Sequence, residues 1–385
     1  TENINSINPA DIKSTTVLKD ATATAIYGAR GANGVILITT KTGKAGETVV
    51  NVDVKTGFNI SLLPRNEVIR SPEQYIGLAW EAKYNKGVAL GEANPEAYAN
   101  NSLFSTSGIA PFYNMWNVAD GGELIDPSTR MVRPGVTRKY NPENWEDYGF
   151  QTSYRQEANL SFSGGDEKTK YFSSFGYLDE EGYLINSDYK RYSARLNVSH
   201  KPKEWLEASA NLGYALSETN NNGQSEDSGS VFWFVDNLPS IYPLYLRDGS
   251  GQRIPDDIFG GSVYDYGSNG RGFGALTNAI ADANYDRSRA KRHELNGNFS
   301  FDVNFTKNLT FETRFGFQYY NDKFFNLNNP FYGSAAGQGG SIYRRDTEYF
   351  AKNFLQMLRY KNNWGNHSLE VLLAHEANDW TQKRN

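Results

Sequence analysis

The second half of the chain shows a regular alternation of apolar and polar residues. Between residues 206 and 217, Leu, Ala or Tyr occupies every second position, and mostly small or amide side chains fill the positions between them. A period of two places successive side chains on opposite faces of a β-strand. By this criterion we predict strands over residues 49–58, 154–164, 170–179, 189–199, 206–217, 291–305, 309–322, 348–361 and 368–380.

The connections between these strands alternate between short and long. Short turns, such as residues 306–308, alternate with long connections over residues 59–148, 180–188, 218–290 and 323–347. In an antiparallel sheet, this alternation places every long connection at the same end of the strands. Outer-membrane β-barrels have short turns on the periplasmic side and long loops on the extracellular side, whereas β-sandwiches follow no such rule. The pattern therefore favours a membrane barrel.

A helix, a turn and a strand are predicted near the start of the chain. Asp20 is placed to cap a short helix over residues 21–27, and Gly28 provides the positive φ angle that ends it. A turn rich in Gly and Asn follows, and the β-branched run over residues 35–40 is typical of a buried strand. A helical turn is also predicted over residues 10–13.

Within the long connection over residues 59–148, one further helix is predicted. Ser71 is its expected N-cap, Pro72 occupies the first helical position, and Gln74 lies three residues after the cap. The apolar stripe of this helix is predicted to consist of Tyr75, Leu78, Ala79 and Ala82. The rest of the connection is rich in Asn, Gly and Pro, and we expect one long ordered loop rather than a second domain.

Composition narrows the class of protein. The 385 residues include 25 Tyr, 22 Phe and 7 Trp but no Cys, and the mean hydropathy is −0.63. No window of about 18 apolar residues exists, which excludes a helical membrane span. A barrel with a polar interior remains compatible with this composition, because it needs an apolar residue only at every second strand position.

Charge and residue content also exclude several activities. A net charge of −5 argues against nucleic acid as a partner, because neutralising phosphates requires a concentrated basic face. The four His residues have no metal-ligand spacing around them, and the absence of Cys excludes thiolate metal sites. No nucleophile, base and orienting group occur together as a triad, so we predict no catalytic residue, no metal and no cofactor.

Two parts of the chain resemble a known family. The residues VLKDATATAIYGARGANGVILITTKTGKAG, at positions 17–46, closely resemble the end of the plug domain in SusC/RagA-type TonB-dependent outer-membrane transporters. Residues 159–165 and 191–197 also resemble early barrel strands of SusC-type proteins. The resemblance implies that residues 1–46 are the C-terminal part of a plug domain and residues 47–385 are the N-terminal part of a transmembrane β-barrel.

The fold class implied is an all-β membrane protein, with a large antiparallel barrel and a small α/β plug segment. Nine strands cannot close around a plug, because barrels of about eight strands are already filled by their own side chains. Plugged barrels have about 22 strands. We therefore expect the chain to be the front part of a longer polypeptide, holding the end of the plug and under half of the barrel.

The resemblance further implies TonB-dependent active import of a nutrient oligomer, either an oligosaccharide or a peptide. The implied location is the outer membrane of a Gram-negative, Bacteroidetes-like cell. The implied partners are a SusD-like surface lipoprotein, TonB of the inner-membrane complex and outer-membrane lipid, and a dimer of transporter–lipoprotein pairs is compatible with them. The alternative is a surface glycan-binding β-protein without transport activity.

Candidate binding residues are aromatic side chains of the long loops, because aromatic rings stack on sugars and on other side chains. The candidates are Trp116, Phe232, Trp233, Tyr242 and Tyr245. The alternative for each ring is that it packs the loop itself or faces a lipoprotein lid. Arg30 is the candidate for an ion pair between the plug and the barrel wall, and its alternative is a surface guanidinium that nearby carbonyls satisfy.

Overall fold

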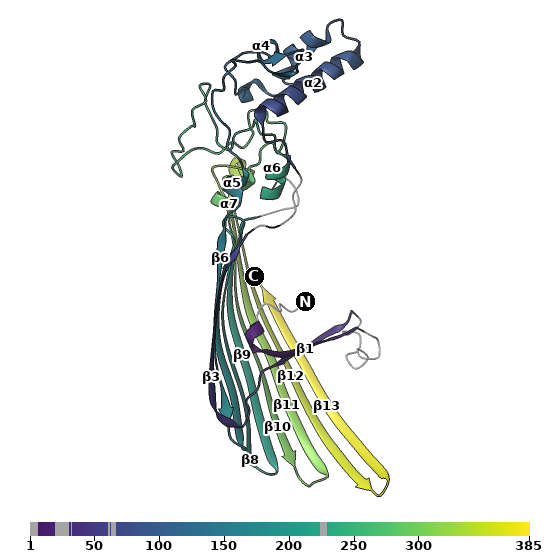
Figure 1. Ribbon diagram of the computed structural model, residues 1–385. Coiled ribbons are helices and arrows are strands. Elements are labelled where there is room, and N and C mark those ends of the chain that lie inside the picture. Colours follow the sequence, from purple (N-terminus) through teal and green to yellow (C-terminus); the bar gives the residue numbers. More distant parts are fainter. Residues whose placement is uncertain (1–6, 20–30, 32, 61, 63–66, 224–228) are drawn as a thin grey trace.

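A long curved sheet with a cap of loops and short helices at one end makes up the structure (Figure 1). This computed structural model describes residues 7–19, 31, 33–60, 62, 67–223 and 229–385. Within these residues, the large sheet has nine strands, and strands that follow one another along the chain lie side by side in it.

All neighbouring strands of the large sheet run antiparallel. In pairing order they are β3 (Gly46–Asn59), β6 (Ser153–Gly165), β7 (Thr169–Glu181), β8 (Asp188–Lys203), β9 (Leu206–Asn221), β10 (Arg287–Asn304), β11 (Leu309–Asn328), β12 (Ser341–Trp364) and β13 (His367–Arg384). Each predicted strand lies within an observed strand, to within one residue. The two-residue period therefore located the strands of the sheet.

The strands extend further toward the cap than the apolar alternation predicted. β11 continues to Asn328 and β12 already begins at Ser341, so the connection predicted over residues 323–347 is reduced to residues 329–340. The added strand residues include charged side chains such as Lys323 and Arg344. These charges interrupt the apolar pattern, but the backbone hydrogen bonds of the ladder do not depend on side-chain polarity.

A separate two-stranded sheet precedes the large one. β1 (Ile12–Leu18) pairs with β2 (Val35–Thr40), which confirms the strand predicted over residues 35–40. We call the described residues 7–18 and 33–41 the N-terminal hairpin. The helix predicted over residues 21–27, with Asp20 and Gly28 at its ends, lies outside the described residues.

The helical turn predicted over residues 10–13 is shorter in the structure. A 3₁₀ turn, η2 (Pro9–Asp11), ends where β1 begins, and Asn8 caps it by accepting a hydrogen bond from the Ala10 N–H at 3.1 Å. The prediction was wrong for Ile12 and Lys13, because the β-branched residues that follow them favour an extended backbone.

The cap consists of residues 67–152, 229–286 and 329–340. Its elements are α2 (Pro72–Leu90), α3 (Pro95–Leu103), η4 (Pro111–Tyr113), α4 (Gly121–Leu124), β4 (Ile125–Asp126), β5 (Met131–Val132), α5 (Glu146–Gly149), α6 (Val231–Asn237), α7 (Ala279–Tyr285) and η5 (Ala336–Gln338). No helix among the described residues has the length and apolar character needed to cross a lipid bilayer.

Helix α2 begins as predicted but buries a different face. Ser71 accepts a hydrogen bond from the Gln74 N–H at 3.3 Å, which confirms the N-cap. The predicted stripe was offset: Leu78 is 47% exposed and Ala82 is also exposed, while Ile76 and Trp80 are buried and Tyr75 and Ala79 only flank them. Gly77 explains the offset, because it lets the backbone of α2 lie close to the backbone at Arg130. A Cβ at this position would lie only 2.5 Å from the carbonyl oxygen of Arg130.

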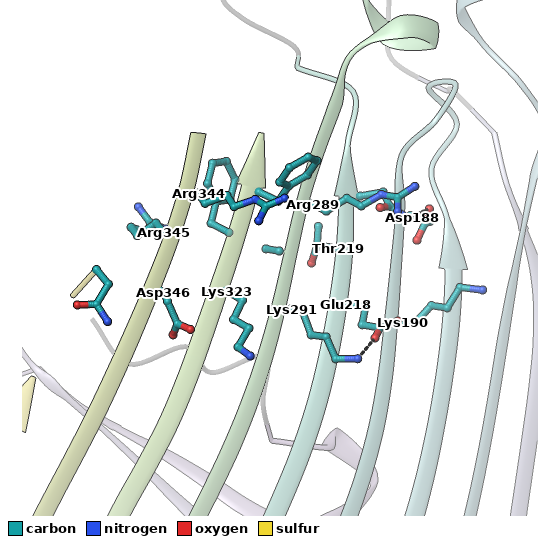
Figure 2. A pocket seen from close by; sticks show the side chains of 15 residues that line it. Asp188, Lys190, Glu218, Thr219, Arg289, Lys291, Lys323, Arg344, Arg345 and Asp346 are labelled. Carbon is teal, nitrogen blue, oxygen red and sulfur yellow. Dashed lines mark hydrogen bonds and ion pairs between the residues drawn. The ribbon is translucent and has the colours of Figure 1, made fainter. Parts of the chain in front are cut away.

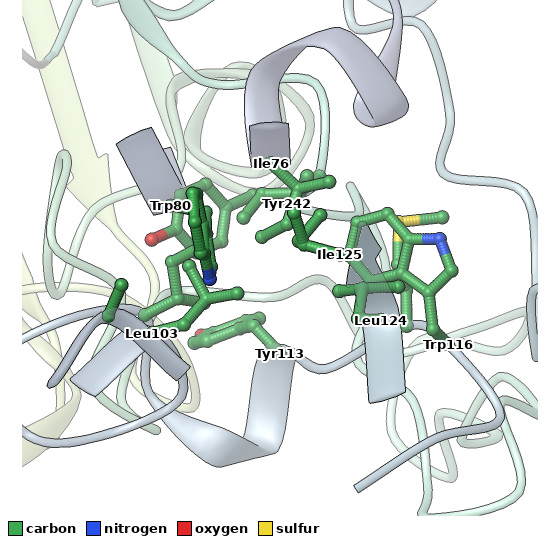
Figure 3. Close-up of a cluster of buried hydrophobic side chains, with 12 residues drawn as sticks. Ile76, Trp80, Leu103, Tyr113, Trp116, Leu124, Ile125 and Tyr242 are labelled. Atoms are coloured by element: carbon green, nitrogen blue, oxygen red, sulfur yellow. The ribbon is translucent and has the colours of Figure 1, made fainter. Parts of the chain in front are cut away.

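Two hydrophobic clusters hold the cap together, and each combines residues from both long connections. The first cluster joins Ile76, Trp80, Ala99, Leu103, Ile109, Tyr113, Met115, Trp116, Leu124 and Ile125 to Ile241 and Tyr242 (Figure 3). The second cluster joins Trp145 to Val231, Phe234, Val235, Leu244, Ala279 and Ile280. The two connections therefore fold as one packed unit, a long-range contact that no local sequence pattern indicates.

Candidate functional site

In its middle part, the large sheet has one mostly polar face and one mostly apolar face. The strand register places Asn159, Arg195 and Asn298 on the same face, which is the face that contacts the N-terminal hairpin. We call it the hairpin face, and the opposite face the outer face. The outer face carries apolar side chains such as Leu196, which is 43% exposed, and Phe301, which is 49% exposed.

Buried polar contacts hold the N-terminal hairpin against the hairpin face. The side chain of Asp11 is only 5% exposed; the Ser174 hydroxyl donates to its Oδ1 at 2.6 Å, and Arg195 Nε donates to its Oδ2 at 3.3 Å. Asn8 Nδ2 donates to Asn159 Oδ1 at 2.7 Å. Buried polar groups are expensive to leave without partners, so these contacts fix the position of the hairpin on the sheet.

The end of β2 makes a further contact with the same wall. Asn197 Nδ2 donates to the carbonyl oxygen of Lys41 at 2.5 Å. A cavity of about 600 Å³ remains beside these contacts, and Asp53, Lys55, Arg155 and Glu157 are among the residues that line it. The N-terminal segment and the sheet therefore meet through polar groups and a polar cavity.

Arg30, the predicted contact between plug and wall, lies outside the described residues, and its role stays a prediction. The ion pair that the structure shows between the N-terminal segment and the wall is formed by Asp11 and Arg195. Sequence reasoning missed this pair. Arg191 and Arg195 are four residues apart in one predicted strand, so they lie on the same face and indicate that this face is charged.

Two of the predicted binding residues are buried in the first cluster of the cap. Trp116 is 1% exposed and Tyr242 is 2% exposed. The ring of Tyr242 meets the ring of Tyr113 edge-on, with 4.9 Å between centroids. Both rings contribute to the core of the cap, which corresponds to the alternative interpretation, and ligand binding by either of them remains untested.

The other three predicted residues lie around the second cluster and are only partly buried. Phe232 packs against Phe150, with 5.1 Å between ring centroids, where the cap meets the sheet. Trp233 meets Phe234 at 5.4 Å, and the guanidinium of Arg253 lies 4.5 Å from the centroid of Tyr245. The structure therefore divides the five candidates between two places. The other three rings are partly exposed, and their role in ligand binding stays a prediction.

A buried ion pair lies in the cap between the two clusters. Arg271 and Asp265 are almost completely buried, with 3.6 Å between Arg271 Nη1 and Asp265 Oδ2. The hydroxyl of Tyr113 donates to Asp265 Oδ1 at 3.2 Å. Burial raises the pKa of the Asp265 carboxyl and lowers the pKa of the Arg271 guanidinium, while their mutual attraction opposes both shifts.

A second charge cluster links residues that are far apart in the sequence. Glu143 is 4% exposed and accepts hydrogen bonds from Arg247, from Arg253 Nη2 at 2.7 Å and from the Leu244 N–H at 3.0 Å. The guanidinium of Arg247 also lies 4.4 Å from the centroid of the Tyr140 ring. Neither charge cluster was predicted, because the position of a single charged residue in a loop does not indicate which distant residue it will pair with.

The carboxyl group of Asp282 makes cap stability dependent on pH. Burial raises its pKa from 3.8 to about 6, even though the Tyr266 hydroxyl donates to it at 2.9 Å; the pKa of neighbouring Asp286 is also raised by burial. Because the folded cap binds this proton more tightly than the unfolded chain, the stability that the proton contributes is present below pH 3.8 and is lost as the pH rises through about 6.

Asp282→Asn is therefore expected to stabilise the cap at pH 7.5 by about 1–2 kcal/mol and to flatten its pH dependence between pH 4 and 7. Hydrogen exchange of cap peptides in the detergent-solubilised protein measures this change. Asp257→Asn removes an exposed carboxylate of the same region and is the control. A cap that stays equally protected at pH 7.5 in wild type and Asp282→Asn contradicts the assignment.

No protein-family model matches the chain, but individual known proteins are similar to it. The chain is 25% identical over 380 residues to TonB-dependent receptor P26 of Formosa agariphila, covering 96% of this chain and 32% of the receptor. It is also 25% identical over 307 residues to TonB-dependent receptor SusC of Bacteroides thetaiotaomicron, covering 78% of this chain and 25% of SusC.

The structure is also similar to that of the RagAB peptide transporter. The TM-score is 0.69 and the sequence identity is 25%, over 98% of this chain and 41% of that chain. These comparisons confirm the resemblance to SusC/RagA-type transporters over most of the chain. The chain spans about a third of the length of the Formosa receptor. The relatives are named as receptors and transporters, and none of the names describes an enzyme.

Proposed function

We propose that this chain forms the end of the plug and the first part of the barrel wall in a SusC/RagA-type transporter. The observation that carries the proposal is the N-terminal hairpin, which is joined to β3 through residues 42–45 and is held on the polar face of the same sheet by buried contacts. A segment held on the inner wall of a barrel occupies its lumen, which is what a plug does.

The outer face supports a place in the outer membrane of a Gram-negative, Bacteroidetes-like cell. Its exposed side chains include Phe175, Leu196 and Phe301. Apolar outer residues alternate with polar hairpin-face residues most clearly in β9 and in the second half of β10. An apolar face of this extent requires an apolar surrounding, and the lipid-facing side of a transmembrane barrel provides one. About 22 strands would close such a wall around the plug.

The buried plug contacts imply that transport needs work. Passage of a large molecule requires that contacts such as Asp11 with Arg195 be broken or moved, and removing one partner of a buried ion pair costs about 3–5 kcal/mol. The outer membrane holds no ATP, so we propose that TonB supplies this work by pulling on the plug. The cargo is a nutrient oligomer, either an oligosaccharide or a peptide, and one similar protein is named as a peptide transporter.

The cap marks the extracellular end of the protein in this proposal. The partly exposed rings Phe232, Trp233 and Tyr245 contact the cargo there, and a SusD-like surface lipoprotein covers the cap. Pairs of transporter and lipoprotein assemble as dimers.

Uptake of the nutrient oligomer is expected to disappear in cells that lack TonB, while binding of the oligomer at the cell surface persists. The measurement is accumulation of labelled oligomer in cells that carry the complete transporter gene, with and without TonB. A small sugar that enters through general porins is the control for membrane integrity. Uptake at the normal rate without TonB contradicts the proposal, and surface binding without uptake in either strain supports a glycan-binding protein instead.

A further inference from the structure

A pocket of about 780 Å³ opens on the outer face of the sheet, at the strand ends nearest the cap (Figure 2). Two rows of side chains from five adjacent strands line this rim pocket. The first row, paired in register from β8 to β12, consists of Lys190, Glu218, Lys291, Lys323 and Asp346. The second row, nearer the cap, consists of Asp188, Asn220, Arg289, Phe325 and Arg344.

Three cations of the rim pocket have no carboxylate within ion-pair distance in the described part of the chain. They are Arg289, Lys323 and Arg344, whereas Lys190 pairs with Asp179 at 3.0 Å and Lys291 pairs with Glu218 at 2.6 Å. Lys323 also lies directly opposite Lys291 in the register. On its other side Lys323 lies opposite Asp346, without an ion pair between them. Like charges opposite each other destabilise a sheet, so an anion bound beside Lys323 would add to the compensation that Asp346 gives.

The guanidinium of Arg344 is positioned by an aromatic ring rather than by a carboxylate. It lies 5.4 Å from the centroid of Phe325, and Phe325 is paired in register with both Arg344 and Arg289. Arg289 and Arg344 therefore occupy the two strands on either side of Phe325, and the guanidinium of Arg344 lies over its ring. Arg groups in this arrangement keep their hydrogen-bond donors free for an anion, and they bind phosphate oxygens in a bidentate manner.

The place of the rim pocket on the sheet indicates the class of anion. Two rows further from the cap, the same face carries Ala194, Tyr214, Leu295, Tyr319 and Phe350. Aromatic and apolar side chains at this level mark the boundary between the hydrocarbon core and the headgroups around a membrane barrel. One mixed row, with Tyr192, Leu216, His293, Asn321 and Glu348, separates this apolar row from the rim pocket. The rim pocket therefore lies at the level of the headgroups, and the apolar surface for acyl chains begins one row below it.

We propose that the rim pocket binds the phosphorylated headgroup of an outer-leaflet lipid. Arg289, Lys323 and Arg344 hold the phosphate, and the acyl chains lie along the outer face over Leu295 and Tyr319. The volume is within the range of small-molecule sites, about 300–1,000 Å³. This inference rests on the proposed function, because it requires that the outer face be in contact with lipid.

Binding of lipid A, a phosphorylated glycolipid, to the complete purified transporter tests the inference. The triple variant Arg289→Gln, Lys323→Gln, Arg344→Gln is expected to bind lipid A roughly 150-fold more weakly than wild type, since each basic residue near the lipid surface contributes about 1 kcal/mol. Lipid A without its phosphates is expected to bind wild type and the triple variant equally weakly. Both measurements are made in neutral detergent, so they do not depend on TonB or on transport.

Control variants separate a specific site from a general loss of charge. Lys168→Gln, Lys203→Gln and Lys307→Gln together remove three exposed cations from the short turns at the opposite end of the sheet, and this variant is expected to bind lipid A like wild type. The single variants keep the test valid if the triple variant does not fold, and each is expected to weaken binding by a part of the total.

Three results would overturn the inference. The first is equal binding of lipid A by wild type and by the folded triple variant. The second is binding of inorganic phosphate as tight as that of lipid A, which indicates an anion site without a lipid role. The third is loss of binding to the lipoprotein partner with lipid binding unchanged, which indicates a protein interface. Failure of uptake to depend on TonB would instead contradict the proposed function and leave these binding measurements unchanged.

Discussion

Phe299→Arg is expected to reduce the amount of assembled protein in the outer membrane strongly, whereas Asn298→Arg is not. Phe299 lies on the outer face near the middle of β10, with its ring 6.4 Å from the rings of both Phe315 and Phe317. Arg on the lipid face at the middle of the bilayer costs about 2–4 kcal/mol. Asn298 is the next residue along the strand, is exposed on the hairpin face and lies opposite Gly316 in the register.

The measurement is the fraction of each variant that reaches the membrane and migrates as folded protein on unheated gels. Phe299→Leu separates the loss of the ring from the introduction of charge, and it is expected to behave nearly like wild type. Equal assembly of Phe299→Arg and Asn298→Arg would show that the two faces do not differ in environment, and the outer face would then not be in contact with lipid.

Arg271→Met is expected to unfold the cap locally while leaving the sheet intact. The Arg271 guanidinium donates to the carbonyl oxygens of Asp265 at 3.1 Å, Phe273 at 2.8 Å and Gly274 at 2.7 Å. Its removal leaves these acceptors without partners and the Asp265 carboxylate buried without a counter-charge. Breaking a buried ion pair from one side costs about 3–5 kcal/mol, which is a large part of the free energy of unfolding of a small packed unit.

Hydrogen exchange and limited proteolysis of the complete protein measure this effect, with peptides of β9 and β10 as the internal reference. Arg253→Met is the matched control: this guanidinium is 41% exposed and shares Glu143 with Arg247, so its loss is expected to cost less than about 1 kcal/mol. Wild-type protection of the cap in Arg271→Met would mean that the two hydrophobic clusters alone stabilise it.

The strands were predictable because each one carries its own signal. In β9 and β10 the two-residue period runs through residues 206–217 and 295–303, and the backbone ladder follows from it. The same signal ends after Asp322 and resumes only at Glu348. The first of these predicted strands therefore ended too early and the second began too late, although the pairing continues to Asn328 and Ser341. A rule based on apolar faces cannot detect strand residues whose outward side chains are charged.

The contacts of the hairpin and the cap were not predictable in the same way. The structural role of Asp11 depends on its ion pair with Arg195, and that of Glu143 depends on its ion pair with Arg247. In both cases a long stretch of chain separates the two partners. The aromatic loop residues were recognised as candidates by composition alone, and composition does not distinguish a core ring such as Trp116 from a partly exposed ring such as Trp233. Burial depends on the tertiary structure.

The shared core of the cap has a consequence for how such proteins diversify. Ile241 and Tyr242 complete a cluster whose other members come from residues 76–125, and Trp145 completes a cluster that comes from residues 231–280. Exchange of either loop alone by recombination leaves cavities and unpaired rings in the core that remains. New variants of the cap must therefore arise by exchange of both connections, residues 59–148 and 218–290, together. An engineered graft likewise has to transfer both connections at once.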